Sequence, residues 1–495
     1  MSKMLILGNP GSAALADIPF VKMDDFIQEV YVAIADGWRA SSYFGVQGPG
    51  AGGQSPARLY AVLTDDRLGV VGVVSTEVVE RFTSLAGLCP QLSLFEREIA
   101  EQCGLLPDGH PWLKPVRFPS GGAGITDYYR VEGQQVHEVA VGPVHAGIIE
   151  PGHFRFQCHG EEVFSLEISL GYQHRGVEEA LIGGPSARSV PLLETVAGDT
   201  SVGHLWAHCL LLENLAERTI SPGAEALRAV ALELERLANH TGDLGALAGD
   251  VGYLPTASFC GRIRGDFLNL TADLCGNRFG RGMLCPGGVG FGLHEADMLG
   301  FLKRLRDAHR DLAGAVDLLW QTPSVMNRFE GTGKVSAETA AELGLVGPAA
   351  RACGLSRDIR QTHPFGIYRK HSCAALEQEG QGDVLARAVQ RRQEADESVR
   401  LITELVENLT GGPEHAALPE RLPGGRLVVA LTEGWRGEIC HVALTDALGR
   451  FARYKITDPS FHNWQGLAMA LRGEQISDFP LCNKSFNLSY CGFDL

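Results

Sequence analysis

The distribution of apolar residues changes near residue 120, and this change constrains the fold more than any other feature. Before it, short apolar runs at residues 59–63 and 70–74 predict strands. Residues 94–100 have the spacing of a short amphipathic helix. The first 122 residues therefore predict a small α/β module.

A stretch rich in proline and glycine follows this module. Pro107, Pro111, Pro115 and Pro119 precede the glycine-rich residues 120–124. Proline and glycine interrupt regular secondary structure, so the stretch is typical of a linker. We place a domain boundary here, with one domain at residues 1–122 and a second at residues 123–495.

The second domain has the pattern of a helical assembly. One strand-like segment at residues 154–170 leads into long helical patterns at residues 222–238, 298–320 and 384–409. Ser221 and Pro222 supply an N-cap and a first-turn proline to the first of these helices. The expected fold class is α+β, with a mainly helical second domain that carries a small β element.

The composition argues against a nucleic-acid partner and against a membrane-spanning segment. The formal net charge is −16, from 43 Lys and Arg against 59 Asp and Glu. We therefore expect no nucleic-acid partner, because phosphate binding depends on clustered basic residues. No uncharged apolar run approaches membrane-spanning length, and the first ten residues are too weakly apolar for a secretory signal. A cytoplasmic protein that reaches a membrane only through partners is expected.

Cofactor motifs that can be identified by spacing are missing. The twelve cysteines include no Cys-x-x-Cys pair, so the sequence predicts neither a zinc ribbon nor an iron-sulfur loop. No Gly-x-Gly-x-x-Gly follows a predicted strand, as a dinucleotide fold requires. We therefore expect no cofactor bound by this chain.

Several motifs in order resemble a known family. Residues 95–105 with 109–111 resemble the end of the 30 kDa subunit of respiratory complex I. Residues 141–156 and 171–178 resemble the opening of the 49 kDa subunit and of membrane-bound nickel-iron hydrogenase large subunits. The fusion of both modules is similar to the large subunit of formate hydrogenlyase. The resemblance implies a hydrogenase large subunit-like fold for residues 123–495.

The chain departs from this family at the metal site. The family's first cysteine pair aligns with Ala197 and Thr200, and its second pair aligns with Leu488 and Cys491. A nickel-iron centre needs soft thiolate donors, and one thiol in four positions cannot supply them. The chain is therefore most similar to the energy-converting hydrogenase related type, which lacks the metal-binding cysteines, and we predict no bound metal.

Complex I differs from this chain at its quinone site. In that relative a histidine near the first hairpin and a tyrosine before His204 face the quinone head group. Here the tyrosine position aligns with Gly198, and His153 lies close to the histidine position. The resemblance leaves quinone as a possible acceptor.

If the fold brings the two former cysteine pairs together, they should border a cleft. Its predicted lining is Ala197, Asp199, Thr200, Leu488, Ser489 and Cys491. Glu150, His153 and His204 should lie nearby. Carboxylates and imidazoles in a partly dry cleft can transfer protons, so we name Glu150, His153, Asp199 and His204 as candidates.

Other interpretations of these residues stay open. Glu150 and His153 could instead satisfy backbone groups at a strand turn. Asp199 is expected to form an ion pair with an arginine such as Arg262 or Arg264, the alternative being proton uptake. Cys491 is expected to be a buried thiol rather than a ligand.

The leading functional hypothesis follows from the resemblance. It is a large subunit in the cytoplasmic arm of a membrane-bound, complex I-like oxidoreductase that passes electrons to quinone or another acceptor and is coupled to ion translocation. The implied partners are an iron-sulfur small subunit, a ferredoxin-like subunit and antiporter-like membrane subunits. The alternatives are a nickel-iron hydrogenase with unusual ligands and a non-catalytic structural adaptor.

Overall fold

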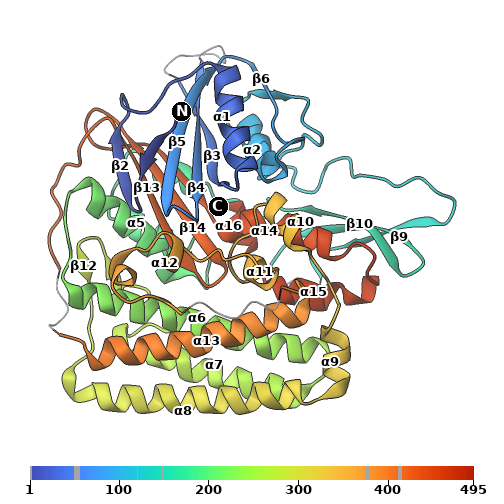
Figure 1. Cartoon of the computed structure of the whole chain (residues 1–495), viewed down its shortest axis with the longest axis vertical. Helices are drawn as coiled ribbons and strands as arrows, with labels where there is room; N and C mark the ends of the chain where they lie inside the picture. The colour runs from blue at the N-terminus through green and yellow to red at the C-terminus, as the bar shows by residue number, and fades with distance from the viewer. Residues whose placement is uncertain (1–2, 49–55, 120, 146–149, 375–379, 411–414) are drawn as a thin grey trace.

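The N-terminal sheet and a layer of long helices lie at opposite ends of the molecule (Figure 1). The computed structural model describes residues 3–48, 56–119, 121–145, 150–374, 380–410 and 415–495. The N-terminal elements are β1 (Leu5–Leu7), β2 (Gly11–Ala14), α1 (Met23–Ala35), β3 (Arg39–Gln47), β4 (Ala57–Asp65), β5 (Val70–Val78), β6 (Arg81–Thr83), η1 (Pro90–Leu92), α2 (Ser93–Cys103) and β7 (Leu106–Asp108).

The first sheet has the strand order β1-β5-β4-β3, and all its pairs are antiparallel. Helix α1 contacts β5, and α2 contacts β3. The predicted strands at residues 59–63 and 70–74 lie within β4 and β5, and the predicted helix at residues 94–100 lies within α2. The two strands and the helix predicted for this module are therefore confirmed.

A three-stranded sheet projects from the side of the molecule (Figure 1). It contains β8 (Val136–Val141), β9 (His153–His159) and β10 (Glu162–Ser169). The strand-like segment predicted at residues 154–170 is therefore two antiparallel strands rather than one. The turn between them contains Gly160 at φ 58°, a backbone conformation that glycine adopts without strain.

The helical layer is formed mainly by α6, α7, α8 and α13 (Figure 1). The elements between β10 and β13 are α3 (Val177–Ala180), α4 (Ser189–Leu193), α5 (Ser201–Leu215), α6 (Pro222–Asp250), α7 (Leu254–Cys275), β11 (Leu284–Cys285), β12 (Gly288–Val289), α8 (Glu295–Trp320), α9 (Pro323–Phe329), α10 (Ala337–Glu342), α11 (Gly347–Ala352), α12 (Ile359–Thr362), η2 (Gly366–Arg369) and α13 (Val384–Glu407).

Helix α6 begins where the sequence predicts. The Ser221 side chain accepts a hydrogen bond from the Ala224 backbone nitrogen at 3.3 Å, and Pro222 occupies the first turn. Most residues of α6 are buried, because α7 and α13 both pack against it. This central helix positions much of the site described below.

The C-terminal sheet joins distant parts of the chain. The last elements are β13 (Arg426–Gly434), β14 (Gly437–Thr445), β15 (Phe451–Thr457), α14 (Pro459–Ala470), η3 (Ile476–Asp478), α15 (Phe479–Phe486) and α16 (Tyr490–Asp494). Their sheet has the order β15-β14-β13-β2, so a strand from the N-terminal segment completes it. Leu427 of β13 lies opposite Ala13 of β2. The boundary at residue 122 stays a prediction, and both sides of it share this sheet.

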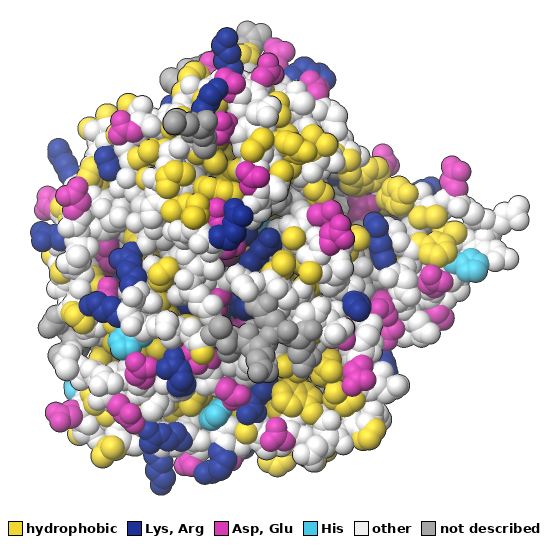
Figure 2. All heavy atoms as spheres, in the orientation of Figure 1, with side chains coloured by type: hydrophobic (Ala, Val, Ile, Leu, Met, Phe, Trp, Pro, Cys, Tyr) yellow, Lys and Arg dark blue, Asp and Glu magenta, His cyan; other side chains and the backbone are white. Residues whose placement is uncertain are grey.

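The surface is mixed in charge. Figure 2 shows Lys and Arg side chains interspersed with Asp and Glu on the face that it presents. Every helix within the described ranges is too short or too polar to cross a membrane.

Candidate functional site

The segments that align with the two former cysteine pairs lie beside each other. Arg175 donates hydrogen bonds to the backbone oxygens of Thr195, at 2.7 Å, and Val196, at 2.9 Å. Its Nη2 also lies 3.5 Å from the Cys491 backbone oxygen. The fold therefore brings together the loop before α5 and the start of α16, which the sequence separates by nearly three hundred residues.

An ion pair occupies the space between these segments. Arg436 donates to both carboxylate oxygens of Asp199, at 2.6 and 2.8 Å, and its Nε donates to the Asn487 backbone oxygen at 2.5 Å. Its guanidinium also lies 3.8 Å from the centre of the Trp435 ring. Bidentate pairs of this kind are the strong form of the arginine–carboxylate interaction. One arginine thus joins both halves of the former metal site.

The ion pair at Asp199 was predicted, but its predicted partner was wrong. Arg262 instead pairs with Asp266 at 2.7 Å and Asp311 at 2.5 Å on the exposed side of α7. Arg264 borders the same cavity as Asp199. Burial alone would raise the pKa of Asp199, but the neighbouring Arg436 guanidinium holds this pKa below its ordinary value.

A polar cavity of about 310 Å³ opens beside this ion pair. Charged and amide side chains predominate in its lining. The lining residues are Glu150, Asp199, Asn239, Gly242, Asp243, Ala246, Arg264, Arg436, Asn483, Lys484, Asn487, Leu488 and Tyr490. A cavity of this size and polarity suits a small polar molecule.

One face of α6 supplies carboxylates and an amide to the site. Glu235, Asn239 and Asp243 are four residues apart and therefore lie on the same helix face. Asn239 donates to the Asp199 backbone oxygen at 2.9 Å, and Arg391 neutralises Asp243 at 2.7 Å. Glu235 accepts hydrogen bonds from the backbone nitrogens of Val202 and Gly203 at the start of α5. Helix α6 thus fixes the loop that carries Asp199.

The two-residue turn between β13 and β14 carries Arg436. Gly434 pairs with Gly437, which leaves Trp435 and Arg436 at the tip of the hairpin. A Cβ atom at Gly437 would lie 2.7 Å from the Gly347 backbone nitrogen, so this position requires glycine. Trp-Arg is not a favoured sequence for a two-residue turn, and nothing in the sequence shows that the tip of this hairpin reaches Asp199.

The predicted proton-transfer residues divide into two groups. Glu150 and Asp199 both border the cavity, and Glu150 accepts a hydrogen bond from the Cys491 backbone nitrogen at 3.1 Å. His153 lies on β9, where its Nε2 accepts from Arg155 at 2.8 Å and its ring is 5.5 Å from that of Tyr128. His153 and His204 are not among the described residues that line the cavity.

His204 belongs to a fully buried chain of hydrogen bonds. It lies 3.0 Å from Asp458 and 3.1 Å from His441. The Tyr454 hydroxyl then bridges His441, at 2.9 Å, and His208, at 2.8 Å. Burial lowers the pKa of His208 to about 3, so its ring is neutral. This chain fastens α5 to β14 and β15, and of its members only His204 was predicted as a site residue.

The four former ligand positions are buried or partly buried. Ala197 is fully buried, and Thr200 donates to Asp199 at 3.1 Å. Leu488 is 5% exposed. The Cys491 thiol lies 3.4 Å from the Ser489 hydroxyl, and burial together with the nearby Glu150 raises its pKa. Cys491 is a partly buried thiol rather than a reactive thiolate.

These residues do not fit a nickel-iron centre. Only Cys491 of the four positions offers sulfur, and the Arg436 guanidinium lies between the segments and repels cations. In the described part of the chain, no group of three His, Cys, Asp or Glu side chains is arranged to hold a metal ion. The Asp199–Arg436 ion pair therefore lies where the family's metal ligands would be.

Glu235 should give the protein a measurable dependence on pH. Burial raises the pKa of Glu235 from its ordinary value of 4.5 to about 8, so the folded chain retains a proton that the unfolded chain releases. Stability from this group is therefore lost as the pH rises between those values. We expect Glu235→Gln to be more stable than the wild type by at least about 2 kcal/mol near pH 9, at about 1.4 kcal/mol per pKa unit.

Urea unfolding at several pH values checks this expectation. Glu338→Gln, at an exposed position of α10, is the matched control. If the free energies of unfolding of the wild type and Glu235→Gln changed with pH in the same way, Glu235 would ionise normally.

Comparisons with known proteins agree with this architecture. A family model described as the 49 Kd subunit of respiratory-chain NADH dehydrogenase matches residues 250–426. The carbon monoxide-induced hydrogenase of Rhodospirillum rubrum is 32% identical over 352 residues, which cover 71% of this chain and 97% of that protein. Formate hydrogenlyase subunit 5 of Escherichia coli is 29% identical over 420 residues, 80% of this chain and 74% of that protein.

A solved structure has the same fold. A chain of the membrane-bound sulfane sulfur reductase, an archaeal respiratory membrane complex, superposes with a TM-score of 0.67 at 22% sequence identity. The match covers 74% of this chain and all of that chain. The extent and identity of these matches show that the chain belongs to the family of the complex I 49 kDa subunit and the related hydrogenase large subunits.

Proposed function

We propose that this chain is the large subunit of the peripheral arm of a membrane-bound, complex I-like oxidoreductase, and that it works without a nickel-iron centre. Its relatives include a hydrogenase, a formate hydrogenlyase subunit and NADH-quinone oxidoreductase subunits. The observation that carries the proposal is the Asp199–Arg436 pair, which lies where thiolates would be needed and borders a polar cavity.

In this proposal the acceptor binds in the polar cavity. An iron-sulfur cluster in a partner small subunit delivers electrons, and quinone or another small acceptor takes up two electrons and two protons. A ferredoxin-like subunit and antiporter-like membrane subunits complete the assembly, which lies on the cytoplasmic side of the membrane. Redox turnover is coupled to ion translocation by those membrane subunits.

The side chains around the cavity have distinct roles in this proposal. The Arg436 guanidinium lines the cavity, where it stabilises negative charge on an acceptor that has received electrons. Glu235 holds a proton at neutral pH and shares a small pocket with Asp199 and Asn239, which makes it a source of protons. Glu150 lies at the same cavity and is a second proton carrier.

The purified complex tests this proposal. We expect it to oxidise reduced methyl viologen with a soluble quinone as acceptor, and to contain nickel far below one atom per chain. We expect Glu235→Gln to lower the turnover number at least about tenfold, as loss of a general acid does. Glu338→Gln, at an exposed position, should retain the turnover number of the wild type.

Other outcomes would support the alternatives. Nickel at one atom per chain together with hydrogen-dependent dye reduction would show a hydrogenase with an unusual ligand set. A complex that assembles normally and shows no turnover with any donor and acceptor pair would show a structural adaptor. An unchanged turnover number in Glu235→Gln would remove Glu235 from proton transfer.

A further inference from the structure

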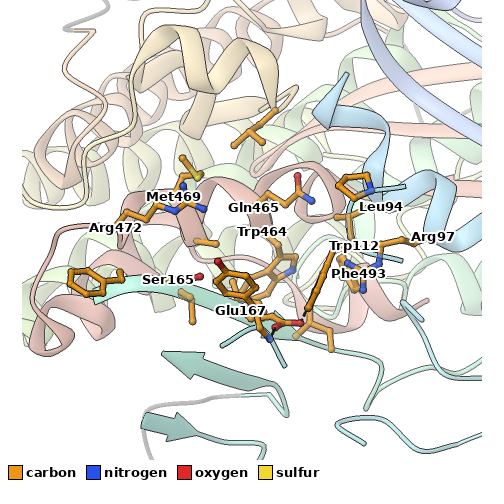
Figure 3. A pocket seen from close by; sticks show the side chains of 18 of the residues that line it. Leu94, Arg97, Trp112, Ser165, Glu167, Trp464, Gln465, Met469, Arg472 and Phe493 are labelled. Carbon is orange, nitrogen blue, oxygen red and sulfur yellow. Dashed lines mark hydrogen bonds between the residues drawn. The ribbon is translucent and has the colours of Figure 1, made fainter. Parts of the chain in front are cut away.

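A second and larger cavity lies apart from the polar one. It measures about 660 Å³ and is bordered by β10, by α14 and by the segment that follows β7 (Figure 3). Trp464 of α14 forms part of its wall, and the Trp464 ring packs edge-on against Tyr490 with ring centres 4.9 Å apart. Tyr490 lines the polar cavity, so these two aromatic rings separate the two spaces.

The wall of this cavity is mainly apolar. Its larger side chains are Trp112, Tyr129, Phe164, Ile168, Trp464 and Phe493. The volume lies within the range of small-molecule sites, which bury most of a ligand against apolar and aromatic surface. The cavity therefore suits a ligand with an apolar body.

Two guanidinium groups border the cavity on opposite sides of Trp464 (Figure 3). Arg97 donates only to backbone oxygens, those of Lys114 at 2.8 Å and Pro115 at 2.9 Å. Arg472 is exposed. Neither arginine forms an ion pair with a carboxylate in the part of the chain that the structure describes. Glu167 and Glu101 act electrostatically on Arg97, so Arg472 is the cation more available to a ligand.

The one carboxylate in the lining is already satisfied. Glu167 forms an ion pair with Lys114, and it accepts hydrogen bonds from Trp112 Nε1 at 3.2 Å and the Tyr129 backbone nitrogen at 2.7 Å. Lys114 therefore cancels the charge of Glu167. The cavity retains a net positive charge from Arg97 and Arg472.

A buried donor in the wall lacks an acceptor. Trp464 is 3% exposed, and within the described ranges its Nε1 has no hydrogen-bond partner. This nitrogen is covered by neighbouring atoms, so it adds a free-energy cost to the wall but is not exposed to the cavity. The wall thus supplies apolar surface and two cations.

We propose that this cavity binds an amphipathic carboxylate, a molecule with an apolar chain or ring system and one anionic head. The apolar body lies against Trp464 and Ile168, and the carboxylate accepts hydrogen bonds from the Arg472 guanidinium. This site is distinct from the proposed acceptor cavity, so it stands whether or not the proposed electron transfer is correct.

Isothermal titration of the full chain with decanoate, below its micelle concentration, tests this site. Decan-1-ol has the same chain without the charge. We expect decanoate to bind at one site per chain and at least about tenfold more tightly than decan-1-ol, because hydrogen bonds to charged groups are the stronger kind.

Substitutions locate the binding. Arg472→Gln changes an exposed side chain and should weaken decanoate binding about tenfold without changing decan-1-ol binding. Trp464→Phe keeps an aromatic wall with less apolar surface and should weaken the binding of decanoate and decan-1-ol to a similar extent. Arg421→Gln removes the same charge from an exposed position that does not line this cavity, and should bind decanoate like the wild type.

Three results would overturn the proposal. The first is equal affinity for decanoate and decan-1-ol. The second is binding without saturation, as in nonspecific partition. The third is the same loss of affinity in Arg472→Gln and Arg421→Gln. A folded Arg472→Gln variant, checked by circular dichroism, keeps the test decisive even if Trp464→Phe fails to fold.

Discussion

Replacing Arg436 by methionine should destabilise the protein by about 3 kcal/mol near pH 7, because it leaves Asp199 without its cation in a partly buried place. The Asp199 side chain is 33% exposed. We therefore expect a loss of stability at the low end of the range for buried ion pairs that lose one partner. Methionine preserves the apolar stem of arginine, so the change mainly removes charge and hydrogen bonds.

The pH dependence of this loss follows from the lowered pKa of Asp199. A carboxylate with a lowered pKa stabilises the fold above its ordinary range, and this contribution is lost as the pH falls through the folded value. The difference between the wild type and Arg436→Met should therefore shrink in acid, where Asp199 becomes protonated. Urea unfolding at neutral and acidic pH measures both effects.

A matched control distinguishes this pair from an ordinary surface pair. Arg450→Met removes an exposed arginine that pairs with Asp446 and should cost much less stability than Arg436→Met. The double variant Asp199→Asn with Arg436→Met should recover part of the lost stability, since it removes the unpaired charge. Equal losses for Arg436→Met and Arg450→Met would contradict our account of the site.

Glu394→Gln should destabilise the protein even more, by about 4 kcal/mol. Glu394 of α13 is fully buried, and it accepts hydrogen bonds from Arg351 at 2.7 and 2.9 Å and from His240 at 2.8 Å. The amide would remove the negative charge that faces both groups, although Arg351 would keep its ion pair with Glu433. Calorimetric or urea unfolding of the variant gives the measurement, with Glu407→Gln on the exposed end of α13 as control.

Glu394→Gln should also affect the candidate site. Arg351 also pairs with Glu433 at 2.8 Å, and Arg236 donates to the backbone oxygens of Glu433 and Gly434. These residues lead directly into the hairpin tip that carries Arg436. We therefore expect Glu394→Gln to lower the turnover number of the complex. If the variant is destabilised but its turnover number is unchanged, the hydrogen bonds of Glu394 do not influence the site.

The local elements of this fold could be predicted from the sequence. Ser221 and Pro222 mark the start of α6, and apolar spacing locates α8 and α13. The apolar runs at residues 59–63 and 70–74 similarly predict β4 and β5. These signals are readable because capping, propensity and periodicity act over a few residues.

Long-range partners could not be predicted in the same way. Arg436 and Asp199 are 237 residues apart, and nothing in either segment selects that arginine over Arg262, whose side chain faces Asp311. The former cysteine positions were found by resemblance alone. The sequence identifies Asp199 as a charge in an unusual place, and only tertiary structure supplies its partner.

The pairing of β2 with β13 has a consequence for any attempt to divide this protein. A chain cut at residue 122 would leave β13 as an edge strand, because the segment that covers it would belong to the other fragment. Nine residues of β13 are nearly all buried, and such an apolar edge readily recruits strands from other molecules. Residues 123–495 expressed alone should therefore aggregate. Expression of residues 1–122 in the same cell should prevent this aggregation.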